Sequence, residues 1–334
     1  MKTKNYLLAA VALMLAACSS DEIANEVAPP DAISFSATIG EQATTRTLFI
    51  PSGETATNLQ DTYFVTGREI KVYKTVGTED PTSAIYTTAD HEGTKNAFNL
   101  KDGETPLTWP TDETATVGLQ AFHPSSYTGS ATAGSFTVSN AQGDITNFYN
   151  SDLMFSNALS TTKTTTTQAF TFAHKLSKVI VNLTRGAGFT DAEWQAATVA
   201  ISAKLKATIA TENNTTTITA ASTDNDPADI AMGTVGETTA TTVNFAAIIV
   251  PQDITLAAST GTYDLIKISI ANKSLTYTLK NTTTSETTKS FESGKKYTYN
   301  LTVSMAGIKL QSTEITNWTE GNTTTEQANQ DILI

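Results

Sequence analysis

The chain has 334 residues, of which 39% are hydrophobic, 8% aromatic and 16% charged; this is the composition of a folded globular protein, long enough for two domains. Its 33 acidic residues outnumber the 21 basic ones and give a net charge of -12, which repels phosphate backbones and argues against nucleic-acid binding. The single cysteine, Cys18, excludes an internal disulfide framework and a thiolate metal cluster. Threonine supplies about a fifth of the residues, and β-branched side chains favour strands, so we expect an all-β protein.

The N-terminal end has the pattern of a secretory signal. Two lysines precede an apolar run, Tyr6 to Ala17, which is too short to span a bilayer as a helix. The run ends in Leu15-Ala16-Ala17-Cys18, which resembles the lipobox of bacterial lipoproteins, whose cysteine is lipidated and becomes the new N-terminus. We therefore predict a lipoprotein signal peptide over residues 1–17 and acyl chains such as palmitate on Cys18, which anchor the chain in a membrane. The alternative is an unmodified thiol in an ordinary signal peptide.

Residues 18–31 form a predicted tether. Its acidic start, Ser19 to Glu22, is similar to the surface-export signal of lipoproteins in Bacteroidetes. The alternative interpretation is a solvated linker that runs to Pro29-Pro30.

The predicted N-terminal domain, residues 32–165, begins with a strand. Ile33, Phe35, Ala37 and Ile39 alternate with polar residues, and side chains two positions apart on a strand share one face. Short strands separated by turn-forming residues follow, at a spacing typical of a sandwich or barrel. We expect them at residues 69–74, 84–88, 96–100, 116–122 and 135–139.

A threonine-rich stretch near residues 160–167 marks the expected boundary with a C-terminal domain over residues 166–334. In that domain only residues 190–197 have helical character, with Thr190 as N-cap and Glu193 completing a capping box. Because no long amphipathic helix interrupts the strands, a parallel nucleotide-binding sheet is not expected. We predict strands at residues 170–172, 176–183, 198–207, 215–220, 243–250, 265–270, 275–279, 296–303 and 308–315.

Residues suited to catalysis or metal binding are few and scattered. His91, His123 and His174 are far apart and have no partner at metal-ligand spacing; we expect His123 to be a turn residue at a strand end, and His174 to lie at a strand end or at the edge of the second core. The acidic run Asp224 to Asp229 lacks the glycine and distal glutamate of a calcium loop, which favours a solvated turn. No nucleophile elbow, helical zinc motif or phosphate loop occurs. We therefore predict no catalytic residue, no metal site and no cofactor.

Short segments spread along the chain form an ordered series. They are Ile33 to Ala37, Thr45 to Thr47, Leu107 to Pro110, Ala121 to Pro124, Asp152 to Phe155, Phe172 to Val179, Ile249 to Gln252, Gly294 to Leu301 and Ile315 to Trp318. In this order and behind a lipobox, they resemble the fimbrillin family, the type V pilins and related Mfa-like surface lipoproteins of Bacteroidales. The resemblance implies two tandem transthyretin-like Greek-key β-sandwich domains, in a precursor that reaches the outer membrane as a lipoprotein.

The resemblance also implies maturation by an arginine-specific protease. On this chain the cut would fall between Arg46 and Thr47, releasing the strand with Ile33, Phe35, Ala37 and Ile39 together with the lipid. An emptied strand position leaves unpaired backbone groups and an apolar groove, which a strand from another subunit can fill. The alternative for Arg46 is an ordinary exposed loop arginine. Arg68 and Arg185 are rival sites, but cutting at either would damage more of the predicted core.

The donated strand is expected near the C-terminus. The available apolar stretches contain Ile308 and Leu310, and Ile332, Leu333 and Ile334. A head-to-tail exchange does not close on itself and therefore generates a filament. Trp318, which lies between these stretches, is expected to be a core plug.

The resulting functional hypothesis is a fimbrial structural or accessory subunit on the cell surface that supports adhesion and is not an enzyme. Its expected partners are other fimbrial subunits, the maturation protease, the outer membrane and a host protein or glycan. The alternative is a non-polymerising surface lipoprotein that binds glycan or host protein. Trp109, Tyr127 or Tyr149 could then stack on sugar rings, although core or turn packing is the favoured interpretation of each. A glycan hydrolase is a third hypothesis, for which the sequence has no motif. The sequence does not distinguish shaft, tip and anchor subunits.

Overall fold

The structure is a computed structural model, and it describes residues 31–40, 61–213, 215–223, 226–236, 238–256, 261–280, 288–318 and 323–324. These residues form strands joined by short connections and two helices, α1 (Ile145–Asn150) and α2 (Asp191–Gln195). The predicted all-β class is confirmed. No helix among the described residues is long and apolar enough to cross a membrane.

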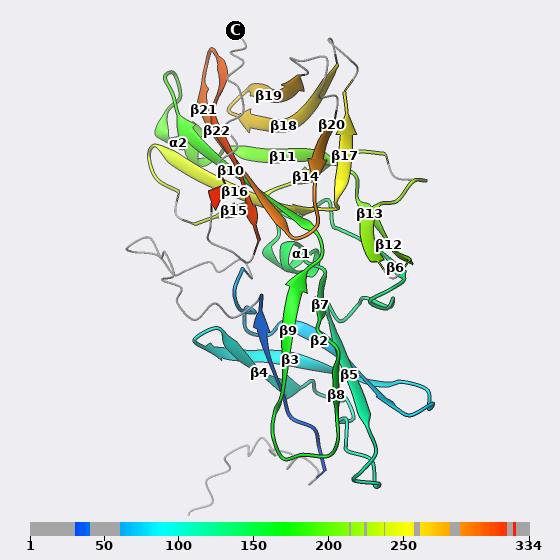
Figure 1. The fold of residues 1–334 in the computed structure, drawn as a ribbon. Coiled ribbons are helices and arrows are strands. Elements are labelled where there is room, and N and C mark those ends of the chain that lie inside the picture. Colours follow the sequence, from blue (N-terminus) through cyan, green and yellow to red (C-terminus); the bar gives the residue numbers. More distant parts are fainter. Residues whose placement is uncertain are drawn as a thin grey trace, which may run out of the picture.

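An eight-stranded sheet forms the lower lobe in Figure 1, with strand order β2-β3-β4-β1-β9-β7-β5-β8. We call it the N-terminal sheet. β2 also pairs with β5, so the hydrogen-bonded strands from β2 to β5 form a closed ring. Its strands are β1 (Phe35–Ile39), β2 (Glu69–Val76), β3 (Thr82–Glu92), β4 (Lys95–Leu100), β5 (Val117–His123), β7 (Met154–Ser156), β8 (Leu159–Thr161) and β9 (Gln168–His174).

The upper lobe contains four smaller sheets. The largest has the order β15-β16-β10-β21-β22-β23 and consists of β10 (Ser177–Arg185), β15 (Gly233–Val235), β16 (Thr242–Ile249), β21 (Lys295–Ser304), β22 (Gly307–Asn317) and β23 (Thr323–Thr324). The second comprises β11 (Thr198–Ala203), β14 (Ala228–Ala231), β18 (Thr262–Ile270) and β19 (Lys273–Lys280). The others are β6 (Gly134–Thr137) with β12 (Lys206–Glu212) and β13 (Thr215–Ala220), and β17 (Gln252–Thr255) with β20 (Thr288–Phe291).

Two strands lie across the boundary expected from the sequence. β9 follows residue 166, yet it pairs with β1 and β7 in the N-terminal sheet. β6 precedes that residue, yet it pairs with β12 in the upper lobe. We therefore propose that the C-terminal lobe begins between β9 and β10, and that β6, from the N-terminal part of the same chain, joins its sheets.

The largest hydrophobic core runs through the upper lobe and continues into the end of the N-terminal sheet. It joins apolar side chains of β10, β16, β11 and β18 to residues from β5, β7 and α1. The residues from the N-terminal half include Phe122, Tyr127, Phe136, Phe148, Tyr149, Leu153 and Phe155. The two lobes therefore share buried apolar surface, and they meet around α1 (Figure 1).

All strands expected from alternation are present, and the expected 198–207 strand is divided into β11 and β12. Helix α2 starts as predicted, because the Thr190 side chain accepts from the Glu193 backbone N–H and the Glu193 carboxylate accepts from the Thr190 N–H. Helix α1 is absent from the prediction. It has fewer than two turns, and its clearest signal is Asp144, whose carboxylate caps the N–H groups of Thr146 and Asn147.

Candidate functional site: the position of strand β1

Strand β1 is an internal strand of the N-terminal sheet. It pairs antiparallel with β4 (Ser36 opposite Ala97) and parallel with β9 over its whole length, from Phe35 opposite Gln168 to Ile39 opposite Phe172. A parallel neighbour requires a long connection, so this pairing is formed by segments more than 130 positions apart in sequence. β1 is therefore held on both edges by strands that come later in the chain.

Backbone hydrogen bonds to neighbouring segments continue beyond both ends of β1. Before it, the Ile33 N–H donates to the Leu107 carbonyl at 2.8 Å and the Ser34 carbonyl accepts from the Gln168 N–H at 2.8 Å. After it, the Gly40 N–H donates to the Phe172 carbonyl at 2.8 Å. Residues 33–40 are thus hydrogen-bonded to neighbouring segments from one end to the other, and we call the position that they fill the slot.

The apolar side chains predicted to share a face are all buried. Ile33, Phe35, Ala37 and Ile39 expose at most 4% of their surface. The Phe35 ring packs edge-on against Tyr86 at 5.1 Å and stacks on Phe170 at 5.7 Å. Each large side chain of this kind contributes about 1.5–3 kcal/mol by burial.

The opposite face of β1 is also covered. Ser36 and Thr38 are buried, and the Ser36 hydroxyl has no hydrogen-bond partner. A buried polar group without a partner costs free energy, so the slot holds a serine at a position where an apolar side chain would be more favourable. β1 is therefore enclosed on both faces and both edges.

The predicted processing site lies outside the described residues. Arg46 and Thr47 fall between Gly40 and Asp61, and Cys18 precedes Asp31. The two rival arginines are built into ordered elements. The Arg68 guanidinium lies over the Tyr149 ring at 5.0 Å, directly before β2, and Arg185 ends β10 and donates to the Ala240 carbonyl at 3.0 Å and to Asp191. A protease needs an extended, accessible segment, so neither rival offers one.

The structure describes only two of the predicted donor residues. Ile308 and Leu310 lie in β22, opposite Val303 and Leu301 of β21, and both are half-buried against the large core. Ile332, Leu333 and Ile334 lie outside the described residues. The two donor residues that the structure describes therefore pair with β21 and not with β1.

A charged cluster lies where the lobes meet, with Lys178 fully buried and Asp61 and Lys296 partly exposed. We call Asp61, Lys178, Lys296 and Trp318 the junction cluster. The Lys178 ammonium, fully buried, lies 2.5 Å from Asp61 Oδ1, which also accepts from Trp318 Nε1 at 2.9 Å. Lys296 lies 3.6 Å from the other carboxylate oxygen. Burial alone would raise the pKa of Asp61, but the two ammonium groups outweigh it and hold that pKa below its usual value.

Trp318 is the plug expected from the sequence. It is 1% exposed, and its ring stacks on His174 with centroids 3.9 Å apart. His174 Nδ1 lies 2.9 Å from Asp152 Oδ1, and both side chains are buried. β9 ends at His174, β10 contains Lys178 near its start, and β22 ends next to Trp318. The junction cluster therefore connects the ends of these three strands to Asp61, the residue that follows residues 41–60.

The histidines and the aromatic residues considered for binding have structural surroundings. His123 ends β5 and is fully buried, with its ring nitrogens 2.9 Å and 3.1 Å from the carbonyls of Glu69 and Tyr149. Trp109, Tyr127 and Tyr149 expose 7%, 2% and 5% of their surface. Core packing, the favoured interpretation of these three rings, is therefore confirmed, and the alternative of stacking on sugars is excluded for them.

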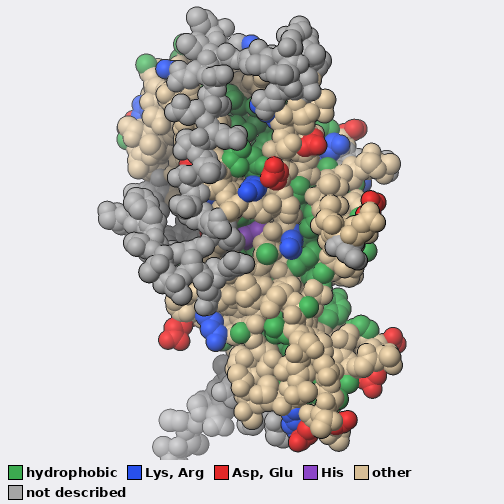
Figure 2. Space-filling view, viewed as in Figure 1, with side chains coloured by type: hydrophobic (Ala, Val, Ile, Leu, Met, Phe, Trp, Pro, Cys, Tyr) green, Lys and Arg blue, Asp and Glu red, His purple; other side chains and the backbone are tan. Residues whose placement is uncertain are grey.

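No group of three or more potential metal ligands occurs in the part of the chain that the structure describes. On the face shown in Figure 2, charged side chains are scattered among uncharged polar atoms. The candidate functional feature is therefore the pairing of β1 with β4 and β9.

The architecture is that of an all-β sandwich protein, and comparison with known proteins makes the class specific. A family model described as Fimbrillin-like matches residues 55–318. The chain belongs to the fimbrillin-like family, as the sequence resemblance indicated.

Solved structures agree with this assignment at the level of fold. A candidate cell adhesion protein from Bacteroides uniformis is 21% identical, with a TM-score of 0.56 over 86% of this chain and 98% of that chain. A candidate cell adhesion protein from Bacteroides ovatus is 16% identical, with a TM-score of 0.56 over 87% and 99%. A search of curated proteins gave no match.

Proposed function

We propose that the chain is a structural or accessory subunit of a fimbrium that supports cell adhesion. Membership of the fimbrillin-like family supports a place on the cell surface and contacts with other fimbrial subunits. The descriptions of the two structural neighbours as candidate adhesion proteins are consistent with this role. The proposed route begins with export as an outer-membrane lipoprotein attached through Cys18.

The proposed assembly step is protease-triggered strand exchange. An arginine-specific protease cuts between Arg46 and Thr47, and the segment with Ile33, Phe35, Ala37 and Ile39 leaves with the lipid. The observation that carries this proposal is the internal position of β1 between β4 and β9. Its loss opens the closed ring, exposes two strand edges and uncovers apolar side chains, a state that favours uptake of another strand.

The incoming strand is proposed to come from the C-terminal end of a second subunit. Ile332, Leu333 and Ile334 are the preferred donors. Ile308 and Leu310 are less suitable because β22 is hydrogen-bonded to β21 along its length, and releasing them would break that ladder. Repetition of the exchange gives a head-to-tail filament, since a heterologous contact does not close.

A conservative substitution at the processing site tests the proposal. Arg46→Lys keeps the positive charge but removes the residue that an arginine-specific protease recognises, so we expect the uncut precursor to accumulate and filaments to be absent. Arg68→Lys is the matched control and should mature normally. Filaments in normal amount from the Arg46→Lys strain would contradict the proposed step, whatever the family assignment.

A further inference from the structure

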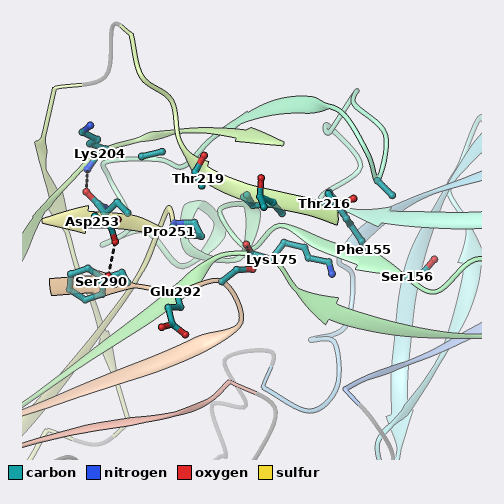
Figure 3. A pocket seen from close by; sticks show the side chains of 17 residues that line it. Phe155, Ser156, Lys175, Lys204, Thr216, Thr219, Pro251, Asp253, Ser290 and Glu292 are labelled. Atoms are coloured by element: carbon teal, nitrogen blue, oxygen red, sulfur yellow. Dashed lines mark hydrogen bonds between the residues drawn. The ribbon is translucent and has the colours of Figure 1, made fainter. Parts of the chain in front are cut away.

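A cleft of about 800 Å³ lies on the upper lobe where it meets β7 (Figure 3). Its walls come from β13, from the start of β17, from the end of β20 and from the β9–β10 connection. This volume is within the range of small-molecule sites. None of these segments belongs to the β1 position, so the cleft is independent of strand exchange.

Two lysines, Lys175 and Lys204, line this cleft, and Lys175 is the one on the side of Phe155 (Figure 3). Its backbone is fixed, because its N–H donates to the Leu153 carbonyl at 2.9 Å and its carbonyl accepts from the Ser293 hydroxyl at 2.9 Å. Its side chain extends toward Phe155, with the ammonium 5.6 Å from the ring centroid (Figure 3). Burial lowers the pKa of Lys175, which means that the surroundings compensate its charge poorly.

Neither carboxylate of the cleft neutralises this ammonium in the structure. Asp253 accepts a hydrogen bond from Ser290 at 2.6 Å, at the end of the cleft away from Phe155 (Figure 3). Glu292 points away from Lys175 in the same view. Within the described residues, no ion pair joins Lys175 to an acidic side chain. A desolvated cation that faces a cleft without a counterion favours an anionic ligand.

The other residues of the cleft indicate which class of anionic ligand fits it. Residues 216–220 of the edge strand β13 line one side of the cleft, and Thr217 and Thr219 share one face of this strand because side chains alternate along it. Phe155, Ile218 and Phe291 are buried, so these apolar side chains present little surface to a ligand in the cleft. A sugar acid offers a carboxylate for Lys175 and hydroxyl groups for Thr217, Thr219 and Asp253.

We propose that this cleft binds a carboxylate-bearing sugar residue, with Lys175 holding the carboxylate and Thr219 a ring hydroxyl. The net charge of -12 does not prevent this, because charges farther away than about 8 Å are largely screened at physiological ionic strength. The site would give the adhesin a ligand specificity that strand exchange alone does not supply.

Binding measured by saturation-transfer NMR and calorimetry tests the proposal on the full-length protein. The probes are 3′-sialyllactose and trigalacturonate as sugar acids, lactose as the neutral sugar and tetraglutamate as the acidic peptide. We expect at least one sugar acid to bind, and lactose and tetraglutamate to bind at least tenfold more weakly. Binding of neither sugar acid, equal binding of lactose, or binding of tetraglutamate alone would overturn the proposal.

Three variants locate the site. Lys175→Met keeps the aliphatic stem over Phe155 and should weaken sugar-acid binding at least tenfold, which is about 1.4 kcal/mol, whereas Lys175→Arg should remain within about threefold. Thr219→Val is isosteric and should weaken binding about threefold to tenfold even if Lys175→Met fails to fold. Lys95→Met, an exposed lysine on β4, is the control. Sugar-acid binding that is unchanged in both Lys175→Met and Thr219→Val would overturn the assignment.

Discussion

At the scale of single residues, the Asp61–Lys178 pair is a sensitive point, because Lys178 is fully buried while 29% of the Asp61 side chain is exposed. Asp61→Asn removes the carboxylate that contacts the buried ammonium, and because Asp61 is partly exposed we expect a loss at the lower end of the range for buried pairs, about 3 kcal/mol. Urea unfolding measures the loss, with Asp253→Asn, an exposed carboxylate hydrogen-bonded to Ser290, as control at under about 1 kcal/mol. Adding Lys178→Met to Asp61→Asn should recover part of the loss. Equal effects of Asp61→Asn and Asp253→Asn would contradict this assignment.

His123 predicts a pH dependence. Burial lowers the pKa of His123 below 6.5, so the unfolded chain binds this proton more tightly than the folded one. The contribution of His123 to stability is therefore complete above pH 6.5 and is lost as the pH falls through the folded pKa. The unfolding free energy should fall between pH 7 and pH 5 in the wild type, by no more than about 1.4 kcal/mol per pH unit.

The variant His123→Gln provides the check. Glutamine can donate to the Glu69 or Tyr149 carbonyl but does not titrate, so the slope over this range should flatten even though the overall stability is lower. His91→Gln, at an exposed position, should keep the wild-type slope. An identical slope in His123→Gln would exclude His123 as the origin.

Residue roles were predictable where one local rule decides them. Trp318 is a plug because a large apolar ring close to the end of a domain is usually buried, and Thr190 caps α2 through a sequence motif. The junction cluster was not predictable, because Asp61, Lys178 and Trp318 are more than 100 positions apart. Core or turn packing is the favoured interpretation of Trp109, Tyr127 and Tyr149 from the sequence, and all three are buried.

At the scale of elements, β1 is the strand whose removal matters most. A chain beginning at Thr47 lacks both ladders of β1 and the burial of Phe35, so we expect it to have a low melting temperature or to refold poorly. A synthetic peptide of residues 31–40 should restore stability in trans by occupying the slot. The same peptide with Phe35→Asp should not. Thermal unfolding with and without peptide measures the gain in melting temperature. Equal gains with both peptides would contradict specific binding of the wild-type peptide in the slot.

Element positions followed from the sequence more readily than their pairing. Alternation located β1, β10, β16 and β21, because a strand with one buried face repeats every two residues. The parallel pairing of β1 with β9, the closure of β2 on β5 and the placement of β6 in the upper lobe depend on contacts between distant segments. No local pattern encodes them, and the cleft at Lys175 was missed for the same reason.

At the scale of the whole molecule, the shared core predicts that the two lobes unfold together. β6, which comes from the N-terminal part of the chain, pairs with β12 in the upper lobe, and Trp318 packs on His174 at the end of β9 of the N-terminal sheet. Scanning calorimetry should therefore give one cooperative transition. Trp318→Ala should lower the midpoint, with a cost of about 3–5 kcal/mol, and separate the lobes into two transitions. Two well-separated transitions in the wild type would contradict this coupling.

The central claim is that the strand at the β1 position is removed when the protein matures. The most direct measurement is mass spectrometry of the N-terminal peptide from protein shaved off intact cells. The account predicts Thr47 as the mature N-terminus, with residues 33–39 absent from the surface polymer. A lipidated Cys18 that persists in the mature protein would contradict it and would instead identify a permanently anchored subunit or a non-polymerising binding protein.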